Sequence, residues 1–432
     1  MKSISLIKAI TLSSGRGSAN LLTLFWMVFL LMFVSCNQEV PVWQRGNVHT
    51  HTFWSDGDDF PESVVKWYSE NGYNFLVMTD HNLILEGEKW RTFPVDHPVL
   101  AKYAENFGKE WVETLPGDQE GIVKVRLKAL EEFRDRFERP GEFMLMMGNE
   151  ISNPHAVHLV AMHQDRVIPA VQGTADDREQ MIRETVANLK QYRNETGINT
   201  WPVLAHPNFT WAITAEMILH TPDLRFFEVY NGHPLVNNQG DEHRASTERI
   251  WDIVLARRLA EGGEVLYGFA TDDTHNYHGG GAGPGKGWVM VRSNDLTPEK
   301  LLDAIDRGDF YASTGVKVRD VQFNGRKISI DIEPEEGVQY TTEFIGTLRG
   351  FDQGSVPTLD SEGNEIENTT RTYSDEIGMV LATDASLTPS YTFSGDELYV
   401  RVRITADQDQ VDPLSGVVLG KQMAWIQPHV KK

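Results

Sequence analysis

Short apolar runs alternate with helical patterns through the first two thirds of the chain. At 182–192 and 249–260, apolar residues recur at helical spacing and glycines follow, as is typical of a helix and its end. A further helix is expected to begin at Pro61, because proline is favoured at the first helical position. The runs typical of buried strands are 47–52, 75–81, 143–151, 158–162, 202–206, 226–231 and 265–272. This alternation predicts an α/β fold with a parallel sheet, most simply a closed (β/α) barrel.

Two segments depart from this alternation. Residues 83–140 form a long insertion between the second and third strands, rich in Trp, Lys and Glu and expected to be helical near 121–137. An insertion at the rim of a site is typical of a lid. From residue 316 the pattern changes to strand-like alternation with Gly, Asp and Asn turns, at 317–332, 341–348 and 397–406. We therefore expect a barrel over 37–315 and a small antiparallel β domain over 316–432.

The N-terminal segment 1–36 has the character of an export signal. It carries basic but no acidic residues, then a mainly apolar stretch at 21–34, and ends at Cys36, the only cysteine in the chain. The apolar stretch is too short for a comfortable membrane span. The segment resembles a bacterial lipoprotein signal, although Phe33 stands where leucine is usual. We expect lipidation of Cys36 and a location in the cell envelope, periplasmic or at the outer membrane or cell surface; the alternative is an uncleaved anchor.

The charge balance excludes one class of partner. Acidic residues outnumber basic residues 62 to 40, which gives a net charge of -22. A surface this negative repels nucleic-acid phosphates, so no nucleic-acid face is expected. The expected membrane contact runs through the lipid on Cys36 alone.

Imidazole and carboxylate side chains gather where the predicted strands end. The run from Asn47 to Thr52 contains two histidines with one residue between them, and alternate residues of a strand project to the same side. In barrels, catalytic groups collect at the carboxyl ends of the strands. The candidate metal ligands are His49, His51, Asp56, His81, Glu150, His158, His206, Asp273 and His275.

Together these motifs resemble the PHP (polymerase and histidinol phosphatase) superfamily, over roughly residues 46–315. The branch they resemble most is the one that includes a carbaryl hydrolase, which also appends a β domain. The resemblance implies a distorted (β/α)7-type barrel. The residues that carry it are His49-Thr50-His51, Ser55-Asp56-Gly57, Thr79-Asp80-His81-Asn82, Gly148-Asn149-Glu150, Val157-His158-Leu159, Ala205-His206-Pro207 and Asp273-Thr274-His275.

The resemblance also implies two or three divalent ions, of zinc, manganese or iron, and the mixture of imidazole and carboxylate ligands suits them. A metal-bound hydroxide would be held by Glu150, Asp273 and His206. In the implied arrangement the first ion is bound by His49, His51, Glu150 and Asp273, the second by Glu150, His158 and His206, and the third by Asp56, His81 and His275.

Some assignments remain open. His155 and His163 compete with His158 for one position, and Asp272 competes with Asp273. Asp80 and Asn82 are expected to support ligands rather than to bind metal. The glycine-rich run 279–287 fails the test for a phosphate loop, because Lys286 is followed by glycine and by a strand. Candidate substrate contacts are Arg91, Asn231, His233 and Lys286.

The predicted function is that of a lipid-anchored, metal-dependent hydrolase. Phosphate monoesters or diesters are the leading substrates, on small molecules or oligosaccharides. Hydrolysis of carboxyl or carbamate esters is the alternative, followed by metal-assisted elimination from a sugar acid. A non-catalytic binding lipoprotein is the contrasting class, and it would be expected to have lost ligands.

Overall fold

The computed structural model describes residues 42–431. The predicted signal segment 1–36, with Cys36, lies outside the described residues. Within the described part, none of the helices combines the length and the apolar character that crossing a membrane requires.

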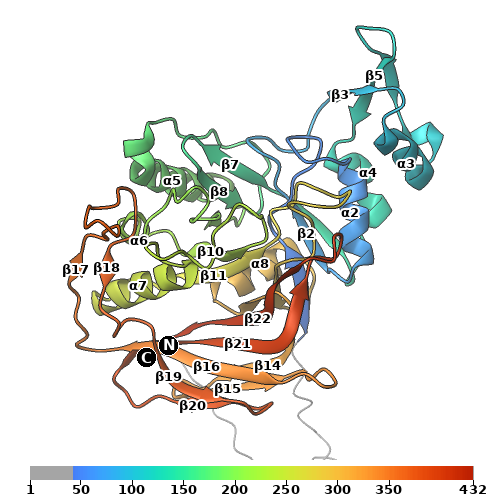
Figure 1. Ribbon diagram of the computed structural model, residues 1–432. Coiled ribbons are helices and arrows are strands. Elements are labelled where there is room, and N and C mark those ends of the chain that lie inside the picture. Colours follow the sequence, from blue (N-terminus) through green and yellow to red (C-terminus); the bar gives the residue numbers. More distant parts are fainter. Residues whose placement is uncertain (1–41, 432) are drawn as a thin grey trace, which may run out of the picture. The chain divides into compact units, whose positions relative to one another are not determined.

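The described residues form a mixed α/β protein with seven α-helices (Figure 1). Two sheets enclose a shared apolar core that includes Val77 and Met146 from one sheet and Val203 and Phe269 from the other. The first sheet contains β1 (Trp43–Asn47), β2 (Phe75–Met78), β6 (Met144–Met147), β12 (Trp288–Arg292) and β13 (Phe310–Ser313). The second contains β7 (Asn149–Asn153), β8 (Val157–Ala161), β9 (Pro202–Leu204), β10 (Phe226–Asn231) and β11 (Tyr267–Thr271).

The sheets are mixed rather than uniformly parallel, which differs from the prediction. Strands β1, β2 and β6 are parallel, as are β9, β10 and β11, whereas β8 is antiparallel to both β7 and β9. The single strand expected over 143–151 is divided at Gly148 into β6 and β7, which belong to different sheets. A Cβ atom at Gly148 would lie 2.6 Å from Val77 and 2.7 Å from the Ala161 carbonyl, so the chain can pass between the sheets only with glycine there.

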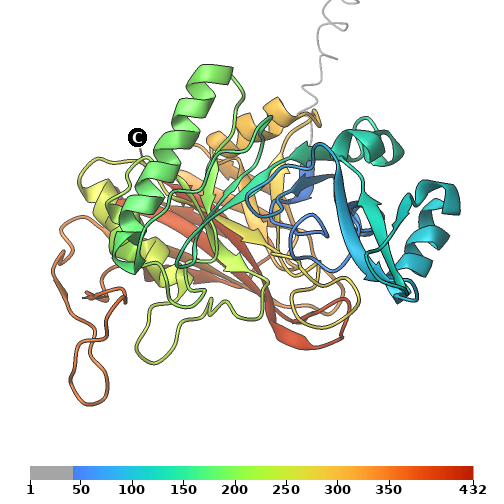
Figure 2. The same cartoon turned by 90° about the horizontal axis from the view of Figure 1, so that it is seen from above.

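The helices predicted from proline and glycine positions are present. Helix α2 (Pro61–Glu70) begins at Pro61, and α5 (Arg178–Thr196) ends at Gly197, whose φ of 72° is the left-handed conformation that glycine favours. Helix α5 packs against β8, and α7 (Thr247–Ala260) packs against β10, on the outside of the second sheet (Figure 2). The remaining helices of this region are α6 (Ala215–Leu219) and α8 (Pro298–Asp306).

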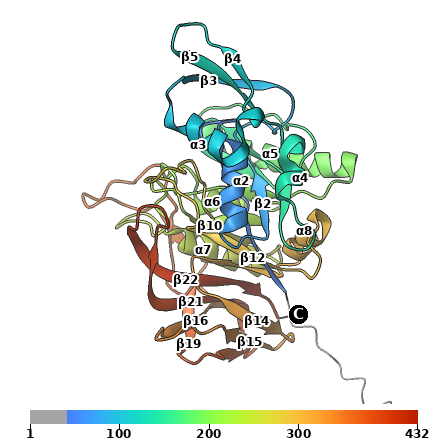
Figure 3. The same ribbon diagram turned by 90° about the vertical axis from the view of Figure 1, so that its right-hand side faces the viewer.

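The insertion after β2 is only partly helical. It contains β3 (Lys89–Pro94), α3 (Pro98–Phe107), β4 (Thr114–Pro116), β5 (Ile122–Leu127) and α4 (Leu130–Phe137). The helix expected near 121–137 therefore begins only at Leu130. The preceding residues form a strand because Val125 and Leu127 are buried while Lys124 and Arg126 are partly exposed, a period of two rather than 3.6. Figure 3 shows the three-stranded sheet of β3, β5 and β4 on the side of the molecule opposite to the C-terminal strands.

The C-terminal β region shares a sheet with β1, β2, β6, β12 and β13. Strand β22 pairs antiparallel with β13, so one nine-stranded sheet runs from β6 to β19. Buried ion pairs also link it to α7, because Arg401 Nη2 lies 2.6 Å from Asp252 Oδ2 and Arg401 Nη1 lies 2.9 Å from Glu248 Oε2. The strands are β14 (Val318–Phe323), β15 (Lys327–Ile332), β16 (Tyr340–Leu348), β17 (Ser355–Val356), β18 (Thr372–Tyr373), β19 (Met379–Asp384), β20 (Ser390–Thr392), β21 (Glu397–Val411) and β22 (Val418–His429).

Candidate metal centre

The two closely spaced histidines follow a strand rather than lie on one. Strand β1 ends at Asn47, and only an isolated bridge between Thr50 and Thr274 continues the pairing. The predicted strand over 47–52 is therefore wrong. Threonine side chains replace the ladder: Thr79 Oγ1 accepts a hydrogen bond of 2.8 Å from the Thr50 amide, and Thr50 Oγ1 donates to the Val77 carbonyl. His49 and His51 are both fully buried by this extended loop.

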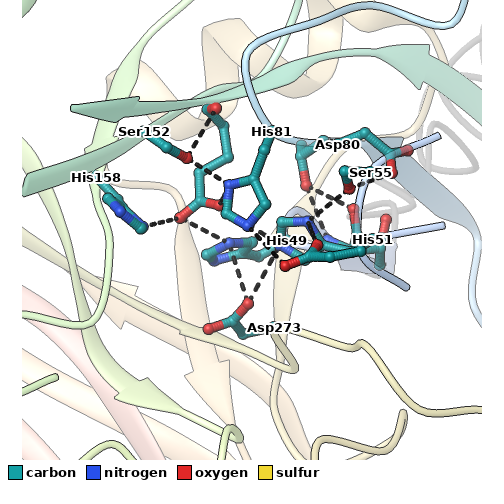
Figure 4. A network of polar contacts seen from close by, with 12 residues as sticks. His49, His51, Ser55, Asp80, His81, Ser152, His158 and Asp273 are labelled. Atoms are coloured by element: carbon teal, nitrogen blue, oxygen red, sulfur yellow. Dashed lines mark hydrogen bonds and ion pairs between the residues drawn. The ribbon is translucent and has the colours of Figure 1, made fainter. Parts of the chain in front are cut away.

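All nine predicted ligands lie in one cluster. Figure 4 labels five of them, His49, His51, His81, His158 and Asp273. Asp273 Oδ1 lies 3.3 Å from both His49 Nε2 and His51 Nε2. Glu150 Oε1 lies 3.0 Å from His158 Nδ1 and 3.2 Å from His206 Nε2. The ligand atoms form four overlapping groups that could each hold an ion: His51, Asp56, His81 and His275; His49, Glu150 and His206; His49, His51 and Asp273; and His81, Glu150 and His158.

The geometry of the cluster fits divalent ions. Two ligand atoms at about 2.1 Å from one tetrahedral ion lie roughly 3.4 Å apart, close to the 3.3 Å that separates Asp273 Oδ1 from both imidazoles. The Nε2 atoms of His49 and His51 are buried and have no hydrogen-bond partner within the described residues. Buried nitrogen atoms without a partner are costly unless a ligand satisfies them. The donor set of imidazole and carboxylate groups suits zinc, manganese or iron.

The groups overlap more than the resemblance implied. His51, expected with the first ion, also joins Asp56, His81 and His275. His81, expected only with the third ion, also comes within 2.7 Å of Glu150 through Nδ1. The number of ions and their division among the ligands stay predictions.

Electrostatics in the cluster favour ionised carboxylates. Burial opposes ionisation of Glu150, but the neighbouring imidazoles hold its pKa well below the ordinary value. The pKa of Asp273 is likewise lowered, against its burial, by His49 and other histidines. Burial disfavours the protonated form of His81, yet Glu150 and Asp56 raise its pKa to about 11. Without metal, protons on imidazole groups such as that of His81 therefore balance the negative charge of the carboxylates. Metal ions that bind to the cluster would displace these protons.

Asp80 and Asn82 support the ligands, as their neighbourhood suggested. The buried Asp80 carboxylate accepts hydrogen bonds from the Thr52 amide at 2.8 Å and from Ser55 Oγ at 2.6 Å. It thereby holds the loop between His51 and Asp56. Asn82 accepts from the Ser152 amide at 3.0 Å and donates to the Ser152 carbonyl at 3.1 Å. Neither side chain belongs to a metal-compatible group.

The geometry favours one residue in each of the two open ligand assignments. Asp273 points into the cluster, whereas the Asp272 carboxylate accepts hydrogen bonds from the amides of Gly285, Lys286 and Gly287 at 2.6–2.9 Å. Among the three competing histidines, His158 alone belongs to a metal-compatible group of the described residues. It is the second residue of β8, whose antiparallel direction brings its first residues to the same rim as the ends of the parallel strands.

Two of the four candidate substrate residues already bind other side chains of the protein through their polar groups. Asn231 Nδ2 donates to Glu228 Oε2 at 2.7 Å and to Asp273 Oδ2 at 3.1 Å, so it orients a predicted ligand. Lys286 is buried, and its ammonium group lies 3.1 Å from Asp412 Oδ2. Its charge is therefore already balanced, which differs from the substrate contact that we expected.

The other two candidates lie at the rim. Arg91 Nη1, on β3 of the insertion, donates to the carbonyls of Phe53 and Ser55 at 3.1 Å, next to the loop that carries Asp56. The His233 ring lies 5.5 Å from the His275 ring. Their contact with substrate stays a prediction.

Glu228 is a site residue that the sequence reading missed. Its Oε1 atom accepts hydrogen bonds from His49 Nδ1 at 2.7 Å and from Thr271 Oγ1 at 2.8 Å. Its Oε2 atom accepts from the His206 amide at 2.7 Å and from Asn231 Nδ2. A carboxylate on Nδ1 directs the Nε2 lone pair of His49 toward the cluster. The available signal was a charged residue inside the apolar run 226–231.

Comparisons with known proteins do not assign the chain to a family. No protein-family model matches the chain, and no curated protein matches it. Among solved structures, it is similar to a two-domain protein from Bacteroides vulgatus that contains a predicted PHP-like metal-dependent phosphoesterase, with a TM-score of 0.38, 13% identity, and coverage of 89% of this chain and 96% of that one. A candidate metal-dependent phosphoesterase from Bifidobacterium adolescentis gives a TM-score of 0.29 and 15% identity, covering 62% of this chain and 96% of that one. With TM-scores this low, the case for metal chemistry rests on the side chains of the cluster.

Proposed function

We propose that this protein is a PHP-type, metal-dependent phosphoesterase. One observation carries the proposal: nine imidazole and carboxylate side chains, from several strands and the loops that follow strands, converge in one cluster and form four overlapping ligand groups. A packed core does not need such a cluster, because buried charges are costly unless they are paired or bind metal. A binding protein that had lost its catalytic site would not need every ligand position filled.

Adjacent ligand groups favour phosphoryl transfer. Glu150 belongs to two groups and its carboxylate has two oxygen atoms, so neighbouring ions would share it. When bound, divalent ions supply a nucleophilic water at neutral pH and stabilise the charge that develops during in-line displacement. The protein's own contribution is to hold the ligands: Glu228 orients His49, Asn231 orients Asp273, and Asp80 fixes the loop between His51 and Asp56.

The insertion is proposed as a cover for the substrate. Its Arg91 side chain contacts the carbonyls of Phe53 and Ser55, so it ties β3 to the loop that carries Asp56. A guanidinium group at this rim suits an anionic substrate. Export and a lipid anchor on Cys36 remain part of the proposal and call for labelling with a fatty acid, which Cys36→Ala should abolish.

A substrate screen tests the proposal. Protein stripped with a chelator is reconstituted with zinc, manganese or iron(II) and assayed on phosphate monoesters and diesters, carboxyl and carbamate esters, and uronate oligosaccharides. We expect metal-dependent release of phosphate or alcohol from the phosphoesters. Hydrolysis confined to the carbonyl esters would overturn the phosphoesterase assignment, and the absence of any metal-dependent reaction would overturn the enzymatic one.

Variants link that activity to the cluster. His81→Ala and Asp273→Asn should each lower activity at least about a hundredfold, because replacing groups that merely support ligands already costs 10–100-fold. His220→Ala is the matched control, since the His220 side chain is 61% exposed and pairs with Glu179 on the surface. His81→Ala protein with unchanged metal content and activity would refute the role given to His81.

A further inference from the structure

The C-terminal hairpin of β21 and β22 reaches the loop that follows the last two predicted ligands. We call residues 276–287 the glycine-rich loop and residues 412–417 the hairpin turn. Gly285 adopts a φ of +83°, and a Cβ atom there would lie 2.9 Å from Pro413 in the hairpin turn. Figure 1 shows this end of the hairpin rising beside the barrel strands. The two segments are therefore in direct contact.

A buried ion pair joins the hairpin turn to the glycine-rich loop. Lys286 Nζ lies 3.1 Å from Asp412 Oδ2, and the two side chains are 2% and 5% exposed. Lys286 Nζ also donates to the Gly281 carbonyl at 2.6 Å. The other Asp412 oxygen accepts from the amides of Leu414 and Ser415 in its own turn. A buried ammonium group needs such a partner, so Asp412 determines where the Lys286 side chain lies.

The glycine-rich loop in turn holds His275. The Ala282 carbonyl accepts from the amides of His275 at 2.8 Å and Asn276 at 2.9 Å. Ala282 directly follows Gly281, the residue that Lys286 binds through its side chain. The His275 carbonyl accepts from the Asp58 amide at 2.9 Å, which extends the connection to the loop carrying Asp56.

Lys286 also fixes the loop through its backbone. Its amide donates to Asp272 Oδ1 at 2.6 Å, and its carbonyl accepts from Gln410 Nε2 of β21 at 2.7 Å. Asp272 directly precedes Asp273. The C-terminal region therefore contacts Lys286, and the Lys286 amide in turn is hydrogen-bonded to Asp272, at the start of the segment that supplies two predicted ligands.

We infer that Asp412 and Lys286 are positioning residues for the metal group of His51, Asp56, His81 and His275, so that the C-terminal hairpin completes this part of the metal centre. The inference rests on the proposed function, because it assumes that the group binds an ion. The inference gives the glycine-rich loop a role in holding His275, so no phosphate site is needed to explain its sequence.

Metal titration of wild-type and variant proteins tests this inference. Asp412→Asn keeps an oxygen for the hairpin turn but removes the charge that faces Lys286. Lys286→Met combined with Asp412→Asn removes both charges, so it separates loss of positioning from the cost of an unpaired lysine. Asp409→Asn is the matched control in the same hairpin, since Asp409 pairs with Lys421 at 2.7 Å while 49% exposed.

We expect both Asp412 variants to bind one zinc ion, the one held by the group of His275, at least tenfold less tightly, with the other ions and the thermal stability of the double variant little changed. His275→Ala should lose the same ion, and adding Asp412→Asn to it should cause no further loss. A merely structural role would lower stability without selecting one ion. Unchanged affinity in both Asp412 variants would overturn the inference alone, whereas wild-type protein that binds no metal would overturn the proposed function as well.

Discussion

Glu228→Gln is the substitution that tests how the cluster is held. The carboxylate is buried and accepts four hydrogen bonds, including one of 2.7 Å from His49 Nδ1. Glutamine has the same shape but replaces one acceptor oxygen with a donor. If the amide nitrogen faces His49, it donates to Nδ1, and the proton of His49 must move to Nε2. That atom lies 3.3 Å from both Glu150 Oε1 and Asp273 Oδ1, so its lone pair is lost to the metal.

The opposite orientation of the glutamine is no better. The amide nitrogen would then face the His206 amide and Asn231 Nδ2, which are both donors. This second arrangement leaves buried donors without an acceptor, at a cost of about 1–3 kcal/mol. Supporting groups of this kind typically contribute 10–100-fold to metal affinity, which corresponds to about 1.4–2.7 kcal/mol. We therefore expect Glu228→Gln to weaken metal binding 10–100-fold.

Competition with a chromophoric chelator measures that affinity, and activity is measured on the same samples with excess metal. Thr271→Val is the control, because it removes one donor to Glu228 and leaves the contact with His49 in place. Its effect should be several times smaller. Glu228→Gln protein that binds metal as tightly as the wild type would show that His49 does not depend on this carboxylate.

Three further predictions concern stability. Arg401→Met leaves the buried Asp252 carboxylate without an ion-pair partner and leaves Glu248 with Arg403 alone, so urea unfolding should show a loss of about 3–5 kcal/mol, and a loss below about 1 kcal/mol would contradict the ion network. Burial lowers the pKa of His429 to about 4, below the value of about 6.5 expected in the unfolded chain, which therefore takes up the proton first as the pH falls. Stability is lost between about pH 6.5 and 4, and His429→Phe should retain about 1–2 kcal/mol more of its pH 7 stability at pH 5; equal losses would refute the assignment. Removal of metal should lower the melting temperature, since ligand at a thousand times its Kd contributes about 4 kcal/mol, and an unchanged melting curve would contradict metal binding to the folded protein.

The parts of the fold that follow from local sequence were predictable. Proline at the start of α2 and glycine after α5 act on the residues next to them, so both helices begin or end where expected. The candidate ligands were also recognisable locally, because most of them lie within, at the start of or just after a predicted strand. Their convergence in the structure reflects a rule of topology, that residues at the carboxyl ends of neighbouring parallel strands lie at the same edge of the sheet.

Features that depend on distant partners were not predictable. The break at Gly148 depends on the Ala161 carbonyl and Val77, and the sheet continues past β13 only because β22 pairs with it. The role of Glu228 depends on His49, 179 positions away in the chain. The sequence likewise suggested that Lys286 contacts an anionic substrate. Its actual ion-pair partner, Asp412, is distant in the chain, and no residue near Lys286 indicates it.

Anomalous X-ray scattering from crystals of zinc-reconstituted protein, recorded on both sides of the zinc absorption edge, tests the central claim most directly. The account predicts two or three anomalous peaks within coordination distance of the nine clustered side chains, with at least one peak bound by Glu150. Crystals grown with saturating zinc that show no peak in the cluster would contradict it.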